Sequence, residues 1–563
     1  MEGRRRACAL AAALVICGLP FQSKGQSVTP GELGNAARQG ELLQRQQQQL
    51  QEERQRQRDR ATEAPAGEAL PKAPVEANAA PSEGKCIDTR SLDLVGAHLL
   101  SKKQVARLEH SVAGHCLGVK ELNALLRRIT DMYVSRGYVT TRAYIPPQNA
   151  GEGRLSIVVI EGKIEKIEVQ PRGSISTTTA FPGMVGEVFN LRDAEQGIDQ
   201  LNRLSSNSAT LDIRPGSTPG SSILVVTDSP TRRVTGSLAA DDTGTPATGL
   251  WQGTATVLAD DLLRINDGLI VSHTRSDPAG PAMSRLTSVN YSVPYGWWTG
   301  SVSYVDSAYA SVVQGVTQNF VTSGTERDGT LRIDRVAYRN QNSKLTFHTD
   351  ITRRDSENFV AGQLIGTSSR VLTLLDLDAN LSKVWGSALW SFDAGLSRGV
   401  SWLGSNAPHS EFLKETAGVA VSRGFTPFGV KTQVSSTFSG QWSNDVLYPS
   451  EQIAIAGPFA VRGYRDTRLF GDRGYTWRNE VGFPFAIGAG THSVVSLRPF
   501  AGWDLGRVES HDNLPGAYLS GWSTGLSLGY APITVQVSWS WAGSRSANIP
   551  SDHFFFARLA ANF

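Results

Sequence analysis

The chain has 563 residues, a formal net charge of +3, 40% hydrophobic and 19% charged residues, and a mean hydropathy of −0.22. This composition excludes a helical membrane protein, which needs long apolar runs, and a wholly disordered chain, which needs a larger net charge and fewer aromatic residues. The small net charge predicts no broad affinity for nucleic acid. A membrane β-barrel stays compatible, because its strands alternate apolar and polar side chains.

The N-terminal segment, residues 1–25, has the parts of a secretory signal peptide. Three arginines at positions 4–6 precede a short apolar run over residues 7–21. This run is shorter than the ~20 residues that a membrane-spanning helix needs, and small residues precede a cleavage site after Gly25. The sequence therefore predicts an exported mature chain.

Cys86 and Cys116 are the two cysteines that remain after processing, and they predict one disulfide. Disulfides form in exported chains, and closing a loop of about 30 residues contributes roughly 3–4 kcal/mol. Two free buried thiols are the alternative. Two cysteines alone do not supply the ligands of a structural zinc site.

Two polar segments precede the first predicted domain. Residues 30–60 are rich in glutamine and arginine and have high helix propensity, but too few apolar residues for a stripe that faces a core. They predict a polar helix that is either solvated or placed in a polar cavity. Residues 61–84 hold four prolines among alanine and glutamate, which predicts an extended linker that reaches roughly 75 Å.

Residues 85–232 combine helical and strand patterns and predict two small α/β domains, 85–162 and 163–232. Apolar residues recur at helical spacing from Leu122 to Tyr133, and Gly137 ends this helix. The second helix is expected over Leu191–Leu204. The expected strands are Val139–Ile145, Leu155–Glu161, Ile164–Val169, Ala209–Arg214 and Ser222–Thr227.

Strand alternation dominates from residue 233 to the end at Phe563. From Ile533 to Trp541 every second side chain is apolar, with threonine, glutamine and serine between them. Such strands are typical of a transmembrane barrel with a lipid face and a lumenal face. A soluble β-sandwich also alternates, but it rarely extends over about 330 residues. At about 21 residues per strand and connection, this segment predicts about 16 antiparallel strands, and 14 or 18 are also compatible.

The last strand is apolar at every second position back from Phe563, which is the terminal signal of outer-membrane barrels. Other motifs follow one another in order along the chain: RGYVTTR at 136–142, PPQ at 146–148, IEGKIE at 160–165, NRL at 202–204, VRGY at 461–464, GDRG at 471–474, RNE at 478–480, and RPF to DLGR at 498–507. In this order they resemble the two-partner secretion transporters of the outer membrane (TpsB), which include the hemolysin-activator and filamentous-hemagglutinin transporters. Two POTRA domains, a barrel and an N-terminal plug helix are the architecture that this resemblance implies.

The resemblance also implies a pairing inside the barrel. It places at the tip of a lumenal loop the residues Val461, Arg462, Gly463 and Tyr464. In the family the loop arginine pairs with an aspartate of the barrel wall, here Asp504. Parity supports the match, because Trp503 and Leu505 would face lipid and Asp504 the lumen, which avoids the ~2–4 kcal/mol cost of a lipid-facing charge. The alternative is that both charges are merely solvated.

The function implied by the resemblance is an outer-membrane pore that recognises an unfolded exoprotein through periplasmic POTRA domains and moves it to the cell surface without nucleotide hydrolysis. The expected partners are a large secreted exoprotein (a hemolysin, an adhesin or a contact-dependent toxin) and outer-membrane lipid. The chain is expected to be monomeric or weakly oligomeric. An assembly factor for other barrels and a porin-like channel are the alternatives.

Enzymatic activity is not expected. Two G-x-S-x-G matches fall within 521–529, where a continuous alternating strand replaces the sharp turn that a nucleophile needs. The nine histidines form no H-E-x-x-H pair. We therefore predict no catalytic residues, no metal and no cofactor.

Overall fold

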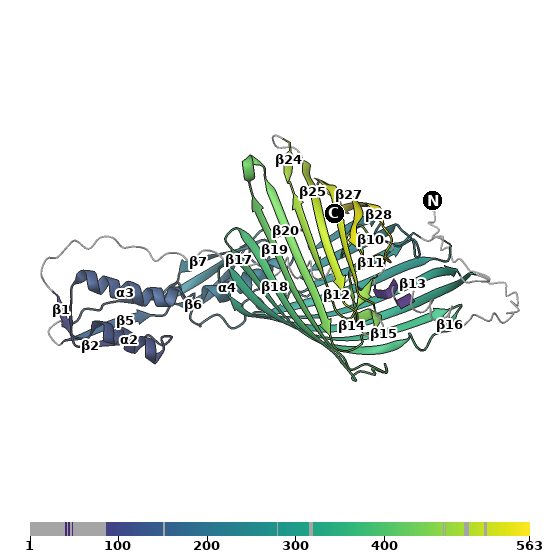
Figure 1. Ribbon diagram of the computed structural model, residues 1–563. Coiled ribbons are helices and arrows are strands. Elements are labelled where there is room, and N and C mark those ends of the chain that lie inside the picture. The colour runs from purple at the N-terminus through teal and green to yellow at the C-terminus, as the bar shows by residue number, and fades with distance from the viewer. Residues whose placement is uncertain are drawn as a thin grey trace, which may run out of the picture.

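The computed structural model describes residues 40, 41, 43–45, 48, 86–149, 153–277, 280–314, 319–465, 467, 469–488, 495–511 and 515–563. Two small α/β domains form an arm on one side of a closed barrel (Figure 1). The predicted signal peptide and linker lie outside the described residues. Among the described residues, no helix is both long and apolar enough to cross a membrane.

The first domain of the arm contains two helices packed on a small sheet in the order β2-β5-β4, beside the pair β1-β3. Its core is built by helix and strand side chains such as Leu108, Ile129, Tyr133 and Leu155, which are almost fully buried. The elements are β1 (Ile87–Thr89), β2 (Ser91–Val95), α2 (Lys102–Val112), β3 (His115–Leu117), α3 (Val119–Val134), β4 (Arg142–Tyr144) and β5 (Arg154–Ile160). The strand expected from Val139 starts three residues later, because residues 139 and 140 form a turn.

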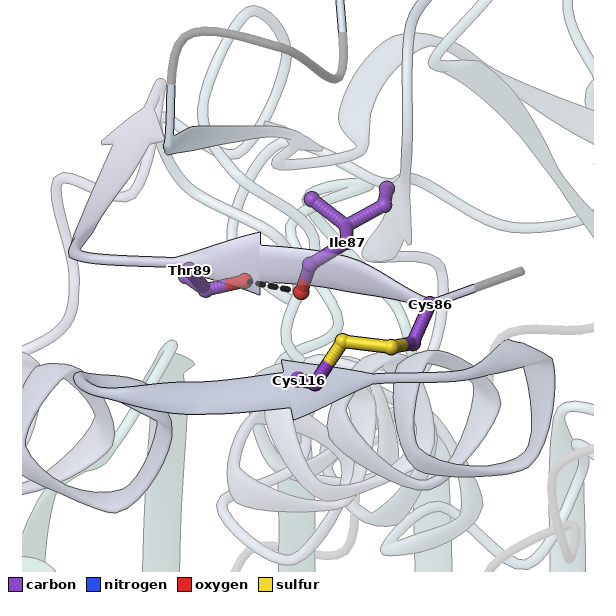
Figure 2. The surroundings of a disulfide bond; sticks show 4 residues. All are labelled: Cys86, Ile87, Thr89 and Cys116. Atoms are coloured by element: carbon purple, nitrogen blue, oxygen red, sulfur yellow. Dashed lines mark hydrogen bonds between the residues drawn. A yellow bond between two sulfur atoms is a disulfide. The ribbon is translucent and has the colours of Figure 1, made fainter. Parts of the chain in front are cut away.

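A disulfide joins Cys86 to Cys116, with the Cα atoms 5.3 Å apart. Figure 2 shows it beside the β1-β3 pair, in which Asp88 lies opposite Cys116. Thr89 Oγ1 donates a hydrogen bond to the Ile87 carbonyl at 3.2 Å in the same strand. The disulfide therefore fastens the start of the arm to β3, the strand that follows α2.

The second domain has the sheet order β6-β8-β7 with one covering helix. Its elements are β6 (Lys163–Gln170), α4 (Leu191–Asn202), β7 (Ala209–Pro215) and β8 (Ser221–Asp228). Helix α4 ends two residues before the predicted Leu204 and is capped at its start by Asn190, whose side chain accepts from Arg192 N. The two domains are joined by an apolar cluster that contains Val139 of the first and Phe189 of the second.

The barrel is closed by sixteen long antiparallel strands, as predicted, with the last strand β28 paired to the first strand β9. Short strands β16 (Gln363–Leu364) and β24 (Phe485–Ile487) extend its rims. The long strands are β9 (Val234–Asp241), β10 (Gln252–Asp260), β11 (Gly268–Ser276), β12 (Met283–Tyr295), β13 (Trp298–Gln314), β14 (Asn319–Arg339), β15 (Ser343–Val360), β17 (Arg370–Trp385), β18 (Ala388–Val400), β19 (Leu413–Phe425), β20 (Thr432–Ser443), β23 (Gly474–Gly482), β25 (Val495–Val508), β26 (Ala517–Tyr530), β27 (Ile533–Arg545) and β28 (His553–Asn562).

Alternation explains the two faces of this barrel. In β27, Trp539 and Trp541 are exposed on the outside, whereas Ser538 and Ser540 are buried on the inside. Successive side chains of a strand point to opposite faces, so apolar and polar residues separate without any long apolar run.

The second arm domain is fixed to three turns at one end of the barrel, which we call the arm end. Arg339 at the end of β14 donates to Asp199 of α4 at 2.5 Å. Gln200 donates to the Gly296 carbonyl at 2.9 Å, and Arg203 donates to the Asn266 carbonyl at 2.6 Å. These contacts identify which ends of the strands face the arm.

Candidate functional site

The connection between β20 and β23, residues 444–473, turns back into the barrel, and we call it the lumenal loop. It contains the 3₁₀ turn η3 (Pro449–Glu451) and the pair β21 (Ile453–Ala454) with β22 (Phe470–Gly471). Ile455, Val461 and Tyr464 are fully buried and form an apolar cluster with wall residues that include Leu519. Apolar packing therefore holds the loop against the wall.

Arg462 and Asp504 lie in contact at the tip of this loop. Arg462 Nε donates to Asp504 Oδ2 at 2.6 Å, and Nη2 donates to Oδ1 at 2.8 Å. The backbone N–H of Arg462 donates to the same carboxylate at 3.0 Å. Asp504 is fully buried. Such a two-pronged guanidinium–carboxylate pair fixes orientation as well as charge.

Glu480 of β23 is a third member of this site that the sequence analysis did not assign. Its carboxylate accepts from Arg462 Nη1 at 2.8 Å and from Arg498 Nη2 at 2.7 Å. Two arginines thus face two carboxylates, and the group is neutral. The RNE motif at 478–480 was noted without a role for Glu480. Parity with exposed Trp477 could have placed Glu480 on the lumenal face, but its partners become visible only through the register of β23 with β25.

Glycines on the loop and on the wall make room for Arg462. Gly463 has a positive φ of 101°, and a Cβ there would lie 2.5 Å from the Trp541 backbone. A Cβ on Gly502 would lie 2.3 Å from Arg462 Nη2, and one on Gly521 only 1.6 Å from the Arg462 carbonyl oxygen. The loop tip therefore fits only a wall without side chains at these positions.

Arg465 extends the site to the junction of the first and last strands. Strands β28 and β9 pair only from Arg558 to Asn562, although the backbone of Phe563, the predicted terminal signal, adds two hydrogen bonds to Gly236 at 2.9 Å. Arg465 Nη2 donates to Asp242 beyond the end of β9 at 2.6 Å and to the carbonyl of a β28 residue at 2.9 Å. The loop thus bridges a short seam.

A second charged group anchors the start of the loop. Glu451 accepts from Arg354 Nη1 at 2.5 Å and from Lys414 Nζ at 2.8 Å. Arg354 also pairs with Asp328 at 3.1 Å. Since Glu451 is buried, these two cations from β15 and β19 are needed to compensate its charge.

Six residues of the predicted polar segment 30–60 are described, namely 40, 41, 43–45 and 48. All six are helical and five of them are buried inside the barrel. Gln48 Nε2 donates to Glu326 on β14 at 2.7 Å. Arg45 Nε donates to the Gln452 carbonyl of the lumenal loop at 2.8 Å. In Figure 1 this short purple helix lies among the barrel strands, and we call it the plug helix.

The lumen beside the plug helix and the loop keeps a cavity of about 520 Å³. The plug helix lines this cavity through Arg45 and Gln48, and the lumenal loop lines it through Ile453. The serines of the G-x-S-x-G matches lie within strand β26. Within the described part of the chain, no three histidine, cysteine or acidic side chains are arranged to hold a metal ion.

Comparison with known proteins agrees with this architecture. The family model of the haemolysin secretion/activation protein ShlB/FhaC/HecB matches residues 220–528. A ShlB-type POTRA model matches residues 87–162, and a further POTRA model matches residues 163–215.

Individual relatives cover most of the chain. The outer membrane transporter CdiB of Dickeya dadantii is 30% identical over 85% of this chain and 87% of its own length. The hemolysin transporter protein ShlB of Serratia marcescens is 30% identical over 86% of this chain and 88% of its own. The structure of CdiB from Escherichia coli superposes with a TM-score of 0.83 at 27% identity, covering 96% of this chain and all of the other.

A sixteen-stranded barrel that carries two POTRA domains and holds a helix and a loop in its lumen defines an outer-membrane transporter with its POTRA domains in the periplasm. The chain belongs to the haemolysin secretion/activation family, ShlB/FhaC/HecB. The predicted family, fold and location are therefore confirmed. The arm end of the barrel is its periplasmic end.

Proposed function

We propose that this chain moves one large unfolded exoprotein across the outer membrane by two-partner secretion, without nucleotide hydrolysis and without a catalytic step. Relatives named as hemolysin transporters and as outer membrane transporters support this function. The cargo is a hemolysin, an adhesin or a contact-dependent toxin. The chain works as a monomer or a weak oligomer.

The observation that carries this proposal is the filling of the lumen by the plug helix and the lumenal loop. A cavity of about 520 Å³ suits a small molecule but does not pass a polypeptide. The plug helix must therefore leave before export begins. Its described contacts with the wall and loop include the hydrogen bonds of Gln48 with Glu326 and of Arg45 with the Gln452 carbonyl.

Polar contacts suit a helix that leaves. A hydrogen bond with one charged partner exchanges with water at a net cost of ~1.5–3 kcal/mol, whereas an apolar interface loses its full burial energy. The predicted linker over residues 61–84 tethers the helix at a reach of roughly 75 Å, so release needs no cleavage.

Capture of the client is assigned to the POTRA domains. Their sheets have the orders β2-β5-β4 and β6-β8-β7, so each domain has two edge strands. An extended chain that adds to an edge is held mainly by backbone hydrogen bonds, which tolerate varied side chains. Folding of the client outside the cell then draws the rest of the client polypeptide outward.

A reversible cross-link between the plug helix and the wall tests the proposal. Gln48→Cys and Glu326→Cys replace two long side chains whose ends lie in hydrogen-bond contact at 2.7 Å. Because cysteine is shorter than either residue, a short thiol-reactive linker with an internal disulfide should join the two thiols, rather than direct oxidation. We expect cells with the cross-linked double variant to lose one large protein from the medium, as cells without the gene do. A reductant should restore it.

The single variants Gln48→Cys and Glu326→Cys are the matched controls, since each carries one new thiol and meets the same reductant. The native Cys86–Cys116 disulfide is present in every variant and so cancels in the comparison. Export at the normal rate from fully cross-linked chains would refute the plug mechanism. An unchanged set of secreted proteins after deletion of the gene would refute the function itself.

A further inference from the structure

Four charged side chains face outward on neighbouring strands at the end of the barrel away from the arm. They are Arg275 on β11, Arg285 on β12, Asp306 on β13 and Arg327 on β14, and we call them the outer-wall cluster. Strand register connects them, because Arg275 lies opposite Arg285 and Asp306 lies opposite Arg327. Tyr304 lies two residues from Asp306 on the same face of β13 and is exposed, so Asp306 also points outward.

The height of the cluster matches the outer headgroup layer. Along β12, exposed Tyr295 lies at the periplasmic end, ten residues from Arg285. At ~3.4 Å per residue and a tilt of ~40°, ten residues rise about 26 Å, close to the ~25 Å apolar band of such barrels. On β14, exposed Leu331 and Ile333 occupy the outward positions nearer the periplasm than Arg327. The cluster therefore lies where lipid tails end.

The cluster has an excess of positive charge. Asp306 forms ion pairs with Arg285 at 3.3 Å and with Arg327 at 3.6 Å, so one carboxylate serves two guanidinium groups. Arg275 stands directly across from Arg285, an arrangement of like charges that is unfavourable without a counter-ion. Within the described residues Arg275 forms no ion pair. The three arginines and one aspartate of the outer-wall cluster together carry a net charge of two positive units.

Acidic neighbours do not remove this excess. Asp355 lies opposite Arg327 across β14 and β15, but its ion pair at 3.4 Å is with Arg353. Asp277, two residues beyond Arg275, forms no ion pair with the cluster. The side chains of Arg285 and Arg327 remain 44% and 56% exposed, so both can reach a ligand.

We propose that the outer-wall cluster binds a phosphate group of a phosphorylated lipid in the outer leaflet. Guanidinium groups offer paired N–H donors that match phosphate oxygens. The cluster faces the membrane, and the apolar wall beside it can contact the acyl chains of the same molecule. This proposal rests on the location of the barrel in the outer membrane and is independent of the exported client.

Lipid binding by the full-length chain in detergent tests the proposal. The probe is bis-phosphorylated lipid A, titrated against the wild type and against the triple variant Arg275→Gln, Arg285→Gln and Arg327→Gln. A basic side chain near a charged membrane surface contributes about fivefold to affinity, so the triple variant should bind roughly a hundredfold more weakly. Arg335→Gln, an outward arginine near the periplasmic end of β14, is the matched control and should bind like the wild type.

Two further titrations separate the lipid from its phosphate. Lipid A without phosphate groups should bind the wild type as weakly as bis-phosphorylated lipid A binds the triple variant. Inorganic phosphate in excess should compete only weakly, because it lacks the acyl chains. Equal binding of bis-phosphorylated lipid A by the wild type and by a folded triple variant would overturn the proposal. Full displacement of the bound lipid by excess inorganic phosphate would also overturn it, because the acyl chains would then contribute nothing to binding. Heat-modified electrophoretic mobility shows whether each variant is folded.

Discussion

Replacing Arg462 with alanine isolates the contact between the lumenal loop and the barrel wall. The change removes two hydrogen bonds to Asp504, one to Glu480 and one to the Asn479 carbonyl. Asp504, which is fully buried, then keeps the backbone N–H of residue 462 as its one donor among the described residues. Breaking a buried ion pair from one side costs ~3–5 kcal/mol.

We expect the lower end of that range, because Glu480 still pairs with Arg498 at 2.7 Å and water can enter the lumen. A loss of about 3 kcal/mol moves the ratio of docked to undocked loop by roughly 150-fold. Export should fall while the barrel still inserts. Hydrogen exchange of residues 455–464 reports docking, and the amount of exoprotein in the medium reports function.

The double variant Arg462→Ala with Asp504→Ala provides the decisive comparison. It removes the uncompensated carboxylate, so its loop should dock better than that of Arg462→Ala alone. Arg498→Ala is the control for a lumenal arginine, since its side chain is 28% exposed and it makes one ion pair, worth less than about 1 kcal/mol. Normal export and unchanged exchange in Arg462→Ala would refute the reasoning.

Three other changes have defined outcomes. Gly521→Ala should undock the loop, because its Cβ would meet the Arg462 carbonyl oxygen, whereas Gly253→Ala meets no atom within 4 Å and should have no effect on exchange. Cys116→Ser should lower the unfolding free energy of the first POTRA domain by roughly 3 kcal/mol, measured by denaturant unfolding of the full chain. Burial raises the pKa of Asp193, which accepts from Trp297 at 3.0 Å. The charged form of Asp193 is therefore disfavoured in the folded state, and stability at the junction of arm and barrel falls as pH rises through this raised pKa. Asp193→Asn should raise the unfolding midpoint of the chain at pH 7, where the wild-type carboxyl is charged, but not below pH 3, where it is neutral. A lower midpoint at pH 7 in Asp193→Asn would contradict this sign.

Local patterns predicted the barrel and one half of the site. Alternation needs only neighbouring residues, so the strand signal survived in β25, where Asp504 is buried and Trp503 lies on the opposite face. The same parity, together with the family motif, placed Arg462 and Asp504 on the same side of the wall. Information within one strand placed Asp504 on the lumenal face, and the family motif supplied Arg462 as its partner.

The other members of the site depend on register between strands that are distant in sequence. Glu480 meets Arg462 because it lies opposite Gly502, which has no side chain to fill the space. Arg465 reaches Asp242, more than two hundred residues earlier in the chain. The sequence also left the polar helix either solvated or enclosed, since its partners are spread over the wall and the loop.

The contact of Arg465 with both sides of the seam couples docking of the lumenal loop to closure of the barrel during assembly. The first and last strands share only a short ladder, and the residue that bridges them belongs to a loop docked deep in the lumen. Barrel closure and loop docking should therefore occur as a single cooperative step. A chain whose loop is misplaced would keep its terminal strands apart, and an incomplete transporter would remain distinguishable from a finished one before it is released into the membrane.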